Sequence, residues 1–340
     1  MLTRISAPWW ATVALTVLLV LASLFGGTFW AHIAILAFMW AAAASAWNIV
    51  GGFAGQTSLG HAAFFGVGAY TSTLLYVHFG ISPWLGMLAG MVLGALLATL
   101  VGLPTLRLRG TYFSLGTFAL GTTMMLVAIQ WRDLTKGGEG LSVPFNEGLL
   151  NFSFLSKTPY VLIALLFMAI SAGVAELIAR SKLGYQLAAI RDDQEAARAL
   201  GIDVTRAKLI AAAISGGLTA MCGTFYAQYI YYINPASVFG SNTSFQPLLL
   251  TIIGGIGTVY GPLLGALTIV PLTQLILGSL GGEAAGLHTL VFGVALVVIV
   301  LFAPAGLGQA AANVRSLLAS RLMGRGQVKP AQPAEQKGVK

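Results

Sequence analysis

The feature of this sequence that most constrains its fold is how few charged residues separate its long apolar stretches. Only 8% of the 340 residues are charged, and 57% are hydrophobic. A soluble domain carries about 25% charged residues, so this chain has too few to cover a water-facing surface of ordinary composition. The composition therefore excludes a soluble enzyme, a disordered chain and a nucleic-acid-binding protein. It predicts an integral membrane protein whose outer surface faces lipid.

Ten stretches of mainly apolar residues are long enough to cross a bilayer as helices, which requires about 20 residues each. They are 8–25, 29–50, 62–79, 83–103, 113–131, 159–179, 208–229, 245–260, 262–279 and 287–303. Lipid offers no partners to free backbone groups, and the alternating ten-residue segments of a barrel are missing. We therefore expect an all-α, polytopic membrane protein with about ten transmembrane helices. The first stretch is interpreted as an uncleaved helix rather than a signal peptide, because the next one follows within a few residues.

Lysine and arginine are distributed unequally between the two sides that ten crossings define. One side holds both termini, the loop 180–208 and fifteen of the 18 basic residues, and the other holds Arg132, Lys136 and Lys157. Because cytoplasmic loops are enriched in these residues, we expect both termini and this loop to be cytoplasmic. The net charge of +8 then reflects topology rather than nucleic-acid binding. Residues 1–310 are predicted to form the membrane domain and 311–340 a basic cytoplasmic tail, disordered at its end.

The loop 180–208 is the most polar part of the chain and contains a predicted short helix. Asp192 can cap it, and Glu195 three residues later resembles a capping box. Gly201 is suited to the stop. A two-turn helix is marginal alone, so we interpret this one as docking on a cytoplasmic partner; the alternative is a solvated connector. The candidate docking residues are Asp192, Glu195, Ala196, Ala197, Arg198 and Gly201.

Two glycine-rich segments, 51–61 and 254–262, interrupt the apolar pattern. Non-helical backbone at membrane depth persists only beside protein or a water-filled cavity, and broken helices of transporters line the substrate path. The tentative pathway residues are Gln56, Thr57, Ser58 and His61. Two alternatives stay open: the glycines allow close helix packing, and His61 is a neutral, hydrogen-bonded structural residue. Both segments begin with Gly-Gly and are followed by a Gly-Ala pair, which leaves an internal repeat open.

Four stretches together resemble a known family. Glu195-Ala-Ala with Gly201 resembles the coupling loop of bacterial ABC importer permeases, although the later Ile-x-Leu-Pro part is missing. Residues 51–70, 109–116 (RGTYFSLG) and 254–266 (GGIGTVYGPLLGA) resemble the LivM-type permease of branched-chain amino acid importers. This resemblance implies a permease that works by alternating access. It also implies three kinds of protein partner: cytoplasmic P-loop ATPases, a second related permease and a substrate-binding protein outside the membrane.

Several chemistries have no sequence support. The chain lacks a Gly-x-x-x-x-Gly-Lys-Ser/Thr run, and its single cysteine, Cys222, excludes an intrachain disulfide. We therefore expect a transport subunit rather than an enzyme, with no cofactor of its own and with ATP bound by partners. Its ligands would be membrane lipid and a small solute: leucine, isoleucine or valine, or a similar amino acid or amide. The competing hypothesis is a stand-alone secondary transporter or channel, which the near absence of intramembrane carboxylates disfavours.

Overall fold

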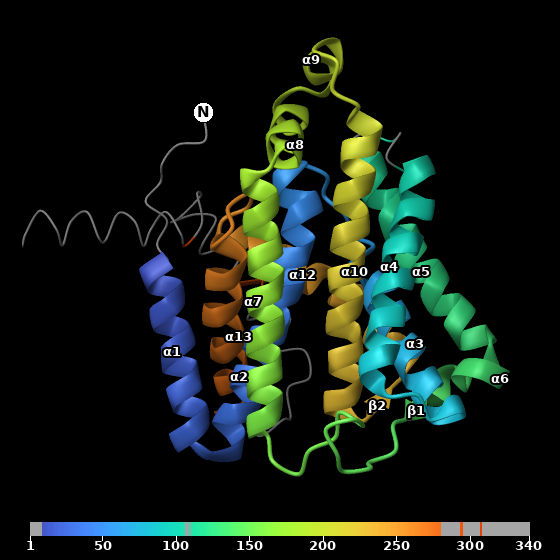
Figure 1. Ribbon diagram of the computed structural model, residues 1–340, viewed down its shortest axis with the longest axis vertical. Coiled ribbons are helices and arrows are strands. Elements are labelled where there is room, and N and C mark those ends of the chain that lie inside the picture. Colours follow the sequence, from blue (N-terminus) through green and yellow to red (C-terminus); the bar gives the residue numbers. More distant parts are fainter. Residues whose placement is uncertain (1–8, 106–107, 109, 280–292, 295–306, 308–340) are drawn as a thin grey trace, which may run out of the picture.

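The computed structural model describes residues 9–105, 108, 110–279, 293–294 and 307. The described chain is a helical bundle with one two-stranded antiparallel sheet (Figure 1). Its long helices are α1 (Trp9–Phe25), α2 (Gly27–Asn48), α3 (His61–Phe79), α4 (Pro83–Thr105), α5 (Thr111–Gln130), α7 (Thr158–Arg180), α10 (Val204–Ile230) and α13 (Gly261–Ser279). The shorter elements are a π-helix (Ile49–Phe53), α6 (Arg132–Thr135), a 3₁₀ turn (Gly137–Glu139), β1 (Leu141–Ser142), α8 (Lys182–Asp192), α9 (Gln194–Ala199), β2 (Tyr232–Ile233), α11 (Pro235–Phe239) and α12 (Ser241–Gly254).

Six helices among the described residues are long and apolar enough to cross a membrane. They are Gly27–Phe53, Pro83–Thr105, Thr111–Gln130, Thr158–Arg180, Val204–Ile230 and Gly261–Gly278. The prediction of an all-helical polytopic protein is confirmed, but the count of about ten is not. The predicted span 287–303, apart from 293 and 294, and the tail 311–340 lie outside the described residues.

The predicted span 245–260 is wrong, because the chain turns inside it. Helix α12 begins at Ser241 and ends at Gly254, and its 14 residues cover about 21 Å, less than the roughly 30 Å of a bilayer core. Gly255 and Gly257 have φ of +127° and +76°, conformations that end a helix and that residues with a side chain rarely adopt. The chain then reverses into α13.

Helix α2 lies at the centre of the bundle. Every residue from 33 to 54 is buried, as expected of a helix that is apolar on all sides. Helices α7 and α13 pack against α2, and α10 packs against α3 and α4. By contrast, α4 and α5 expose many large apolar side chains, among them Leu88, Leu96 and Leu115. An apolar exposed face of this kind suits contact with lipid.

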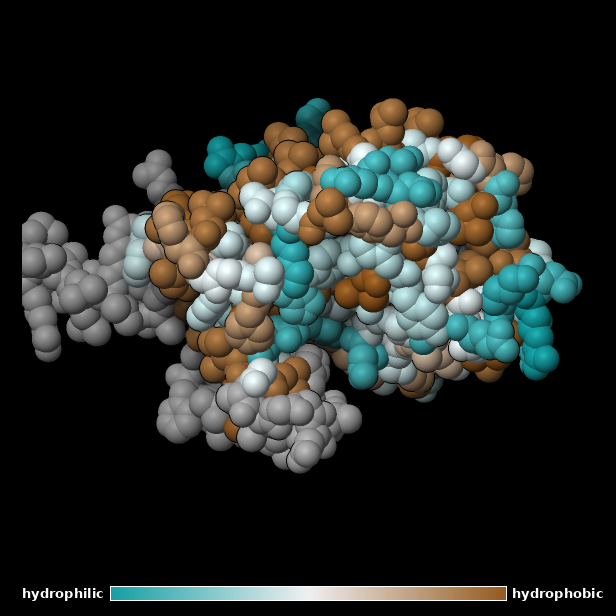
Figure 2. All heavy atoms as spheres, turned by 90° about the horizontal axis from the view of Figure 1, so that it is seen from below, coloured by the Kyte–Doolittle hydropathy of each residue, from teal (hydrophilic) through white to brown (hydrophobic). Residues whose placement is uncertain are grey.

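The two ends of the bundle differ. Helices α8 and α9 project from one end, and the β1–β2 sheet lies at the other (Figure 1). This sheet pairs Leu141 with Ile233, so it joins the 132–158 loop to the segment that follows α10. Viewed from the β1–β2 end, hydrophilic side chains gather over the middle of the molecule and hydrophobic ones lie around much of its edge (Figure 2).

Candidate functional site

The short helix α9 is present, but its cap lies one residue later than predicted. Asp193, not Asp192, is the N-cap: its Oδ1 accepts hydrogen bonds from the backbone N–H groups of Glu195 (2.8 Å) and Ala196 (3.1 Å). Asp192 is instead the last residue of α8. The hydrogen bonds from the Ala196 and Glu195 backbones lower the pKa of the Asp193 carboxyl. The cap therefore remains charged at neutral pH, where it also complements the helix dipole.

The end of α9 matches the prediction for Gly201. This residue has φ of +83°, and its N–H donates to the Arg198 carbonyl at 3.0 Å, while the Ile202 N–H donates to the Ala197 carbonyl at 3.1 Å. These two bonds form a Schellman motif. Both ends of a six-residue helix are thus closed by local hydrogen bonds, which compensate for its short length.

The side chains of α9 divide into an inner and an outer set. Ala197 is buried, whereas Glu195, Ala196 and Arg198 are not, and the Arg198 guanidinium lies 3.3 Å from the Glu195 carboxylate. Leu200, which the sequence reasoning missed, follows the helix and is 81% exposed. Its place at the projecting tip makes this side chain a candidate contact for a partner. The available clue was a leucine immediately before the stop glycine.

Helix α9 is attached to the bundle through α10. Lys208 is 2% exposed, and its ammonium group donates to the Gln194 side-chain oxygen at 2.8 Å. Gln194 is the first residue of α9, and Lys208 lies in the second turn of α10. A buried ammonium group that donates to the first residue of α9 resists separation of α9 from α10, because a buried charge is costly to leave without its hydrogen bonds.

Both glycine-rich segments are breaks between helices, as predicted, and they contact each other. The first lies between the π-helix, which ends at Phe53, and α3; the second lies between α12 and α13. Asn48 bonds to the second break from the end of α2: its Nδ2 donates to the Thr258 carbonyl at 2.8 Å, and its Oδ1 accepts from the Gly257 N–H at 2.9 Å. One buried amide side chain thus holds a backbone donor and a backbone acceptor of the second break.

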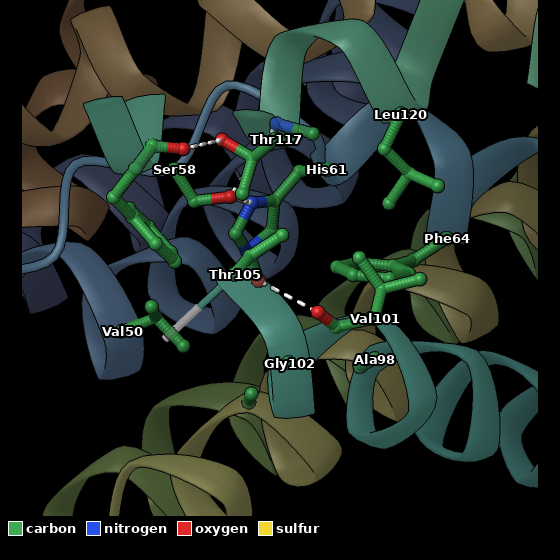
Figure 3. Close-up of a pocket in the computed structure, with 13 residues that line it drawn as sticks. Val50, Ser58, His61, Phe64, Ala98, Val101, Gly102, Thr105, Thr117 and Leu120 are labelled. Atoms are coloured by element: carbon green, nitrogen blue, oxygen red, sulfur yellow. Dashed lines mark hydrogen bonds between the residues drawn. The ribbon is translucent and has the colours of Figure 1, made fainter. Parts of the chain in front are cut away.

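His61 lies in a hydrogen-bond network at the start of α3, and Figure 3 shows it next to Ser58. The Ser215 hydroxyl donates to the Ala46 carbonyl at 2.6 Å and therefore accepts from His61 Nε2 at 2.9 Å. His61 Nδ1 is then the acceptor for the Ser58 hydroxyl, 3.2 Å away. One neutral tautomer satisfies every one of these bonds. The geometry supports the alternative of a neutral structural histidine.

The predicted pathway residues do not share one cavity. Ser58 and His61 line a cavity of about 30 Å³ with Phe64, Ala98 and Thr117 among others (Figure 3), which is room for roughly two waters and too little for an amino acid. Thr57 is exposed. The Gln56 Oε1 atom is buried and has no hydrogen-bond partner among the described residues.

The fold and these features describe a polytopic membrane protein with a projecting, doubly capped helix and two helix breaks in contact. Comparison with known proteins identifies the class. The model of the family described as the permease component of the branched-chain amino acid transport system matches residues 29–301. The chain therefore belongs to this permease family, and it is a multi-pass membrane protein.

Individual relatives differ in what their names say they transport. The high-affinity branched-chain amino acid permease LivM of Salmonella typhimurium is 28% identical over 76% of this chain and 65% of its own length. LivM of Escherichia coli gives the same values, so this chain spans 65% of both relatives. A tyrosine transport permease of Clostridioides difficile is 27% identical over 48% of this chain and 54% of its own length. No solved structure matches this chain.

Proposed function

We propose that this chain is the pore-forming permease subunit of an ATP-driven importer in the bacterial inner membrane. Helix α9 carries the proposal: it is closed at both ends, projects from the bundle and exposes Leu200 at its tip. Such a helix suits a groove on a cytoplasmic P-loop ATPase, which would bind and hydrolyse the ATP. A second, related permease would complete the pathway.

Transport would proceed by alternating access. ATP would draw two ATPases together, and α9 would move with its ATPase. The Lys208–Gln194 bond would pass this motion to α10, which packs along α3 and α4. At the opposite end, a substrate-binding protein would dock on the surface where the β1–β2 sheet joins the two outer segments. With α9 cytoplasmic, that end faces outward.

The proposed substrates are leucine, isoleucine and valine, or similar small amino acids and amides. Similarity to LivM proteins of two bacteria supports this choice. The tyrosine permease and an autoinducer 2 permease of Photorhabdus luminescens, 28% identical over 54% of this chain, indicate that related permeases serve several solutes. The choice of solute would then depend largely on the substrate-binding protein.

Copurification tests the proposed function directly. The tagged chain is extracted gently from its own host. P-loop ATPases and a second polytopic chain are expected to copurify with it and to be identified by mass spectrometry. A tagged, unrelated polytopic protein from the same membranes is the control for carry-over. Recovery of the chain alone, with transport activity in ATP-free liposomes, would instead establish the stand-alone transporter or channel.

A paired substitution tests whether the first break lines the pathway. Gln56→Leu is expected to leave stability unchanged, because it replaces a buried oxygen that lacks a partner among the described residues by an apolar group. Leucine uptake should nevertheless fall if Gln56 contacts the solute. Ser58→Leu should lower the unfolding free energy by about 1–3 kcal/mol, since it removes the hydroxyl bonded to His61 and overfills the small cavity. Normal uptake kinetics in Gln56→Leu would indicate that this segment only packs helices.

A further inference from the structure

One side chain connects the projecting end of the molecule to both helix breaks. Arg191 lies in the last turn of α8, two residues before the cap of α9. Its Nη1 donates to the Gly52 carbonyl at 3.1 Å, although 139 residues separate the two. Gly52 belongs to the π-helix that ends the central helix. A charged donor thus satisfies a carbonyl at a helix C-terminus, where the dipole favours a cation.

Two glycines leave the space that the Arg191 side chain occupies. A Cβ at Gly55 would lie 2.7 Å from Arg191 Cγ, and a Cβ at Gly257 would lie 2.7 Å from Arg191 Nη1. Gly55 belongs to the first break and Gly257 to the second, so the side chain of Arg191 lies against both. The absence of side chains at these two positions is what admits it.

The remaining contacts make the two breaks one unit. Asn48 is fully buried, and its side chain forms hydrogen bonds with Gly257 and Thr258 of the second break. Asn48 lies one helical turn before Gly52, whose carbonyl accepts the hydrogen bond from Arg191. A Cβ at Gly52 would lie 2.7 Å from the Gly257 nitrogen, so the two backbones touch. A displacement at Gly52 must therefore move the second break as well.

The other polar contact of Arg191 is weak. Its guanidinium forms an ion pair with the neighbouring Asp192 at 3.7 Å, and the two side chains are 40% and 79% exposed. An exposed pair of this kind contributes little and is screened by salt. The bond to Gly52, which is buried, is therefore the contact that determines where this guanidinium sits.

We propose that Arg191 is a positioning residue that transmits the motion of α9 to the two helix breaks, so that ATP binding by the partner reorients both breaks together. This role rests on the proposed function. Helix α8 connects Arg191 rigidly to the cap of α9, and the guanidinium holds the C-terminal end of the central helix. Loss of this bond should leave α9 able to dock, and still bonded to α10 through Lys208, but should remove its direct link to the breaks.

Maleimide labelling in the purified complex with its ATPases tests this role without knowledge of the substrate. Thr57→Cys places a reactive group at an exposed position of the first break, against a low background because Cys222 is buried. ATP with vanadate is expected to change the labelling rate by roughly fivefold or more when Arg191 is present. Arg191→Gln should abolish this change, and Arg191→Lys should restore part of it because an ammonium also donates to a carbonyl.

Two further measurements separate this role from simpler ones. Lys182→Gln, an exposed position on the same helix α8, is expected to behave as the parent does. ATPase recovery should be equal in all variants. The proposal would be overturned if the labelling rate still changed with ATP and vanadate in Arg191→Gln, or if it did not change in the parent complex. So would loss of the ATPase from Arg191→Gln, which would make Arg191 a docking residue. Failure of the parent to recover any ATPase would refute the proposed function itself.

Discussion

Gly223→Ala is expected to destabilise the bundle strongly, by about 3 kcal/mol, the upper end of the range for overpacking. A Cβ at this position would lie 1.9 Å from the Phe65 carbonyl oxygen of α3. Backbone cannot move aside as a side chain can, so α3 and α10 would have to separate. The reverse contact is equally tight, because a Cβ at Gly68 would lie 1.9 Å from the Ala220 carbonyl oxygen. The unfolding temperature in detergent measures this loss of stability, with size-exclusion chromatography used to detect the folded protein that remains after heating.

Gly173→Ala is the matched control. Gly173 lies in the middle of α7, and no neighbouring element of the described chain comes within 4 Å of the place that an added methyl group would take. Alanine there should stabilise the helix by about 0.5–1 kcal/mol, because it reduces the freedom of the unfolded chain. Equal shifts in the unfolding temperature of the two variants would contradict the close backbone packing of α3 and α10.

Loss of ATPase association is the largest functional effect we expect, and it should follow from Leu200→Asp. Leu200 is 81% exposed, so the substitution should not disturb the fold. A buried apolar anchor at an interface contributes about 2 kcal/mol or more, or roughly 30-fold in affinity. Glu195→Lys should weaken association too, because it places a second cation beside Arg198, which now pairs with Glu195 at 3.3 Å.

The measurement is ATPase recovery per mole of tagged permease, with expression and thermal stability as controls for folding. Arg206→Gln, which changes an exposed residue early in α10, should recover the ATPase as the parent does. Full recovery with Leu200→Asp and Glu195→Lys would mean that α9 is a solvated connector and that coupling enters elsewhere.

The membrane helices were predictable because lipid imposes a length and forbids free backbone groups. The predicted span 83–103 appears as Pro83–Thr105, and 159–179 as Thr158–Arg180. The prediction failed at 245–260, because this stretch is mainly apolar although the chain reverses direction within it. Gly255 and Gly257 were visible in the sequence, but only their positive φ values show that the chain turns there rather than kinks.

The cap of α9 illustrates a second limit. Asp192 and Asp193 are adjacent, and either carboxylate can cap a helix. The choice depends on where α8 ends, and α8 extends to Asp192 while Leu187 and Ile190 on its inner face are buried. Tertiary packing of one helix therefore decides the register of the next cap.

Composition and pattern alone determined that the chain is a helical membrane protein, where both helix breaks lie and that a capped helix lies between α7 and α10. Each of these depends on local chemistry: hydropathy, glycine conformation and capping hydrogen bonds. Only the tertiary structure brought Asn48 to Gly257, 209 residues away, enclosed His61 in its network and directed Arg191 to Gly52. Apolar periodicity specifies which face of a helix is buried but not which distant backbone group that face will meet.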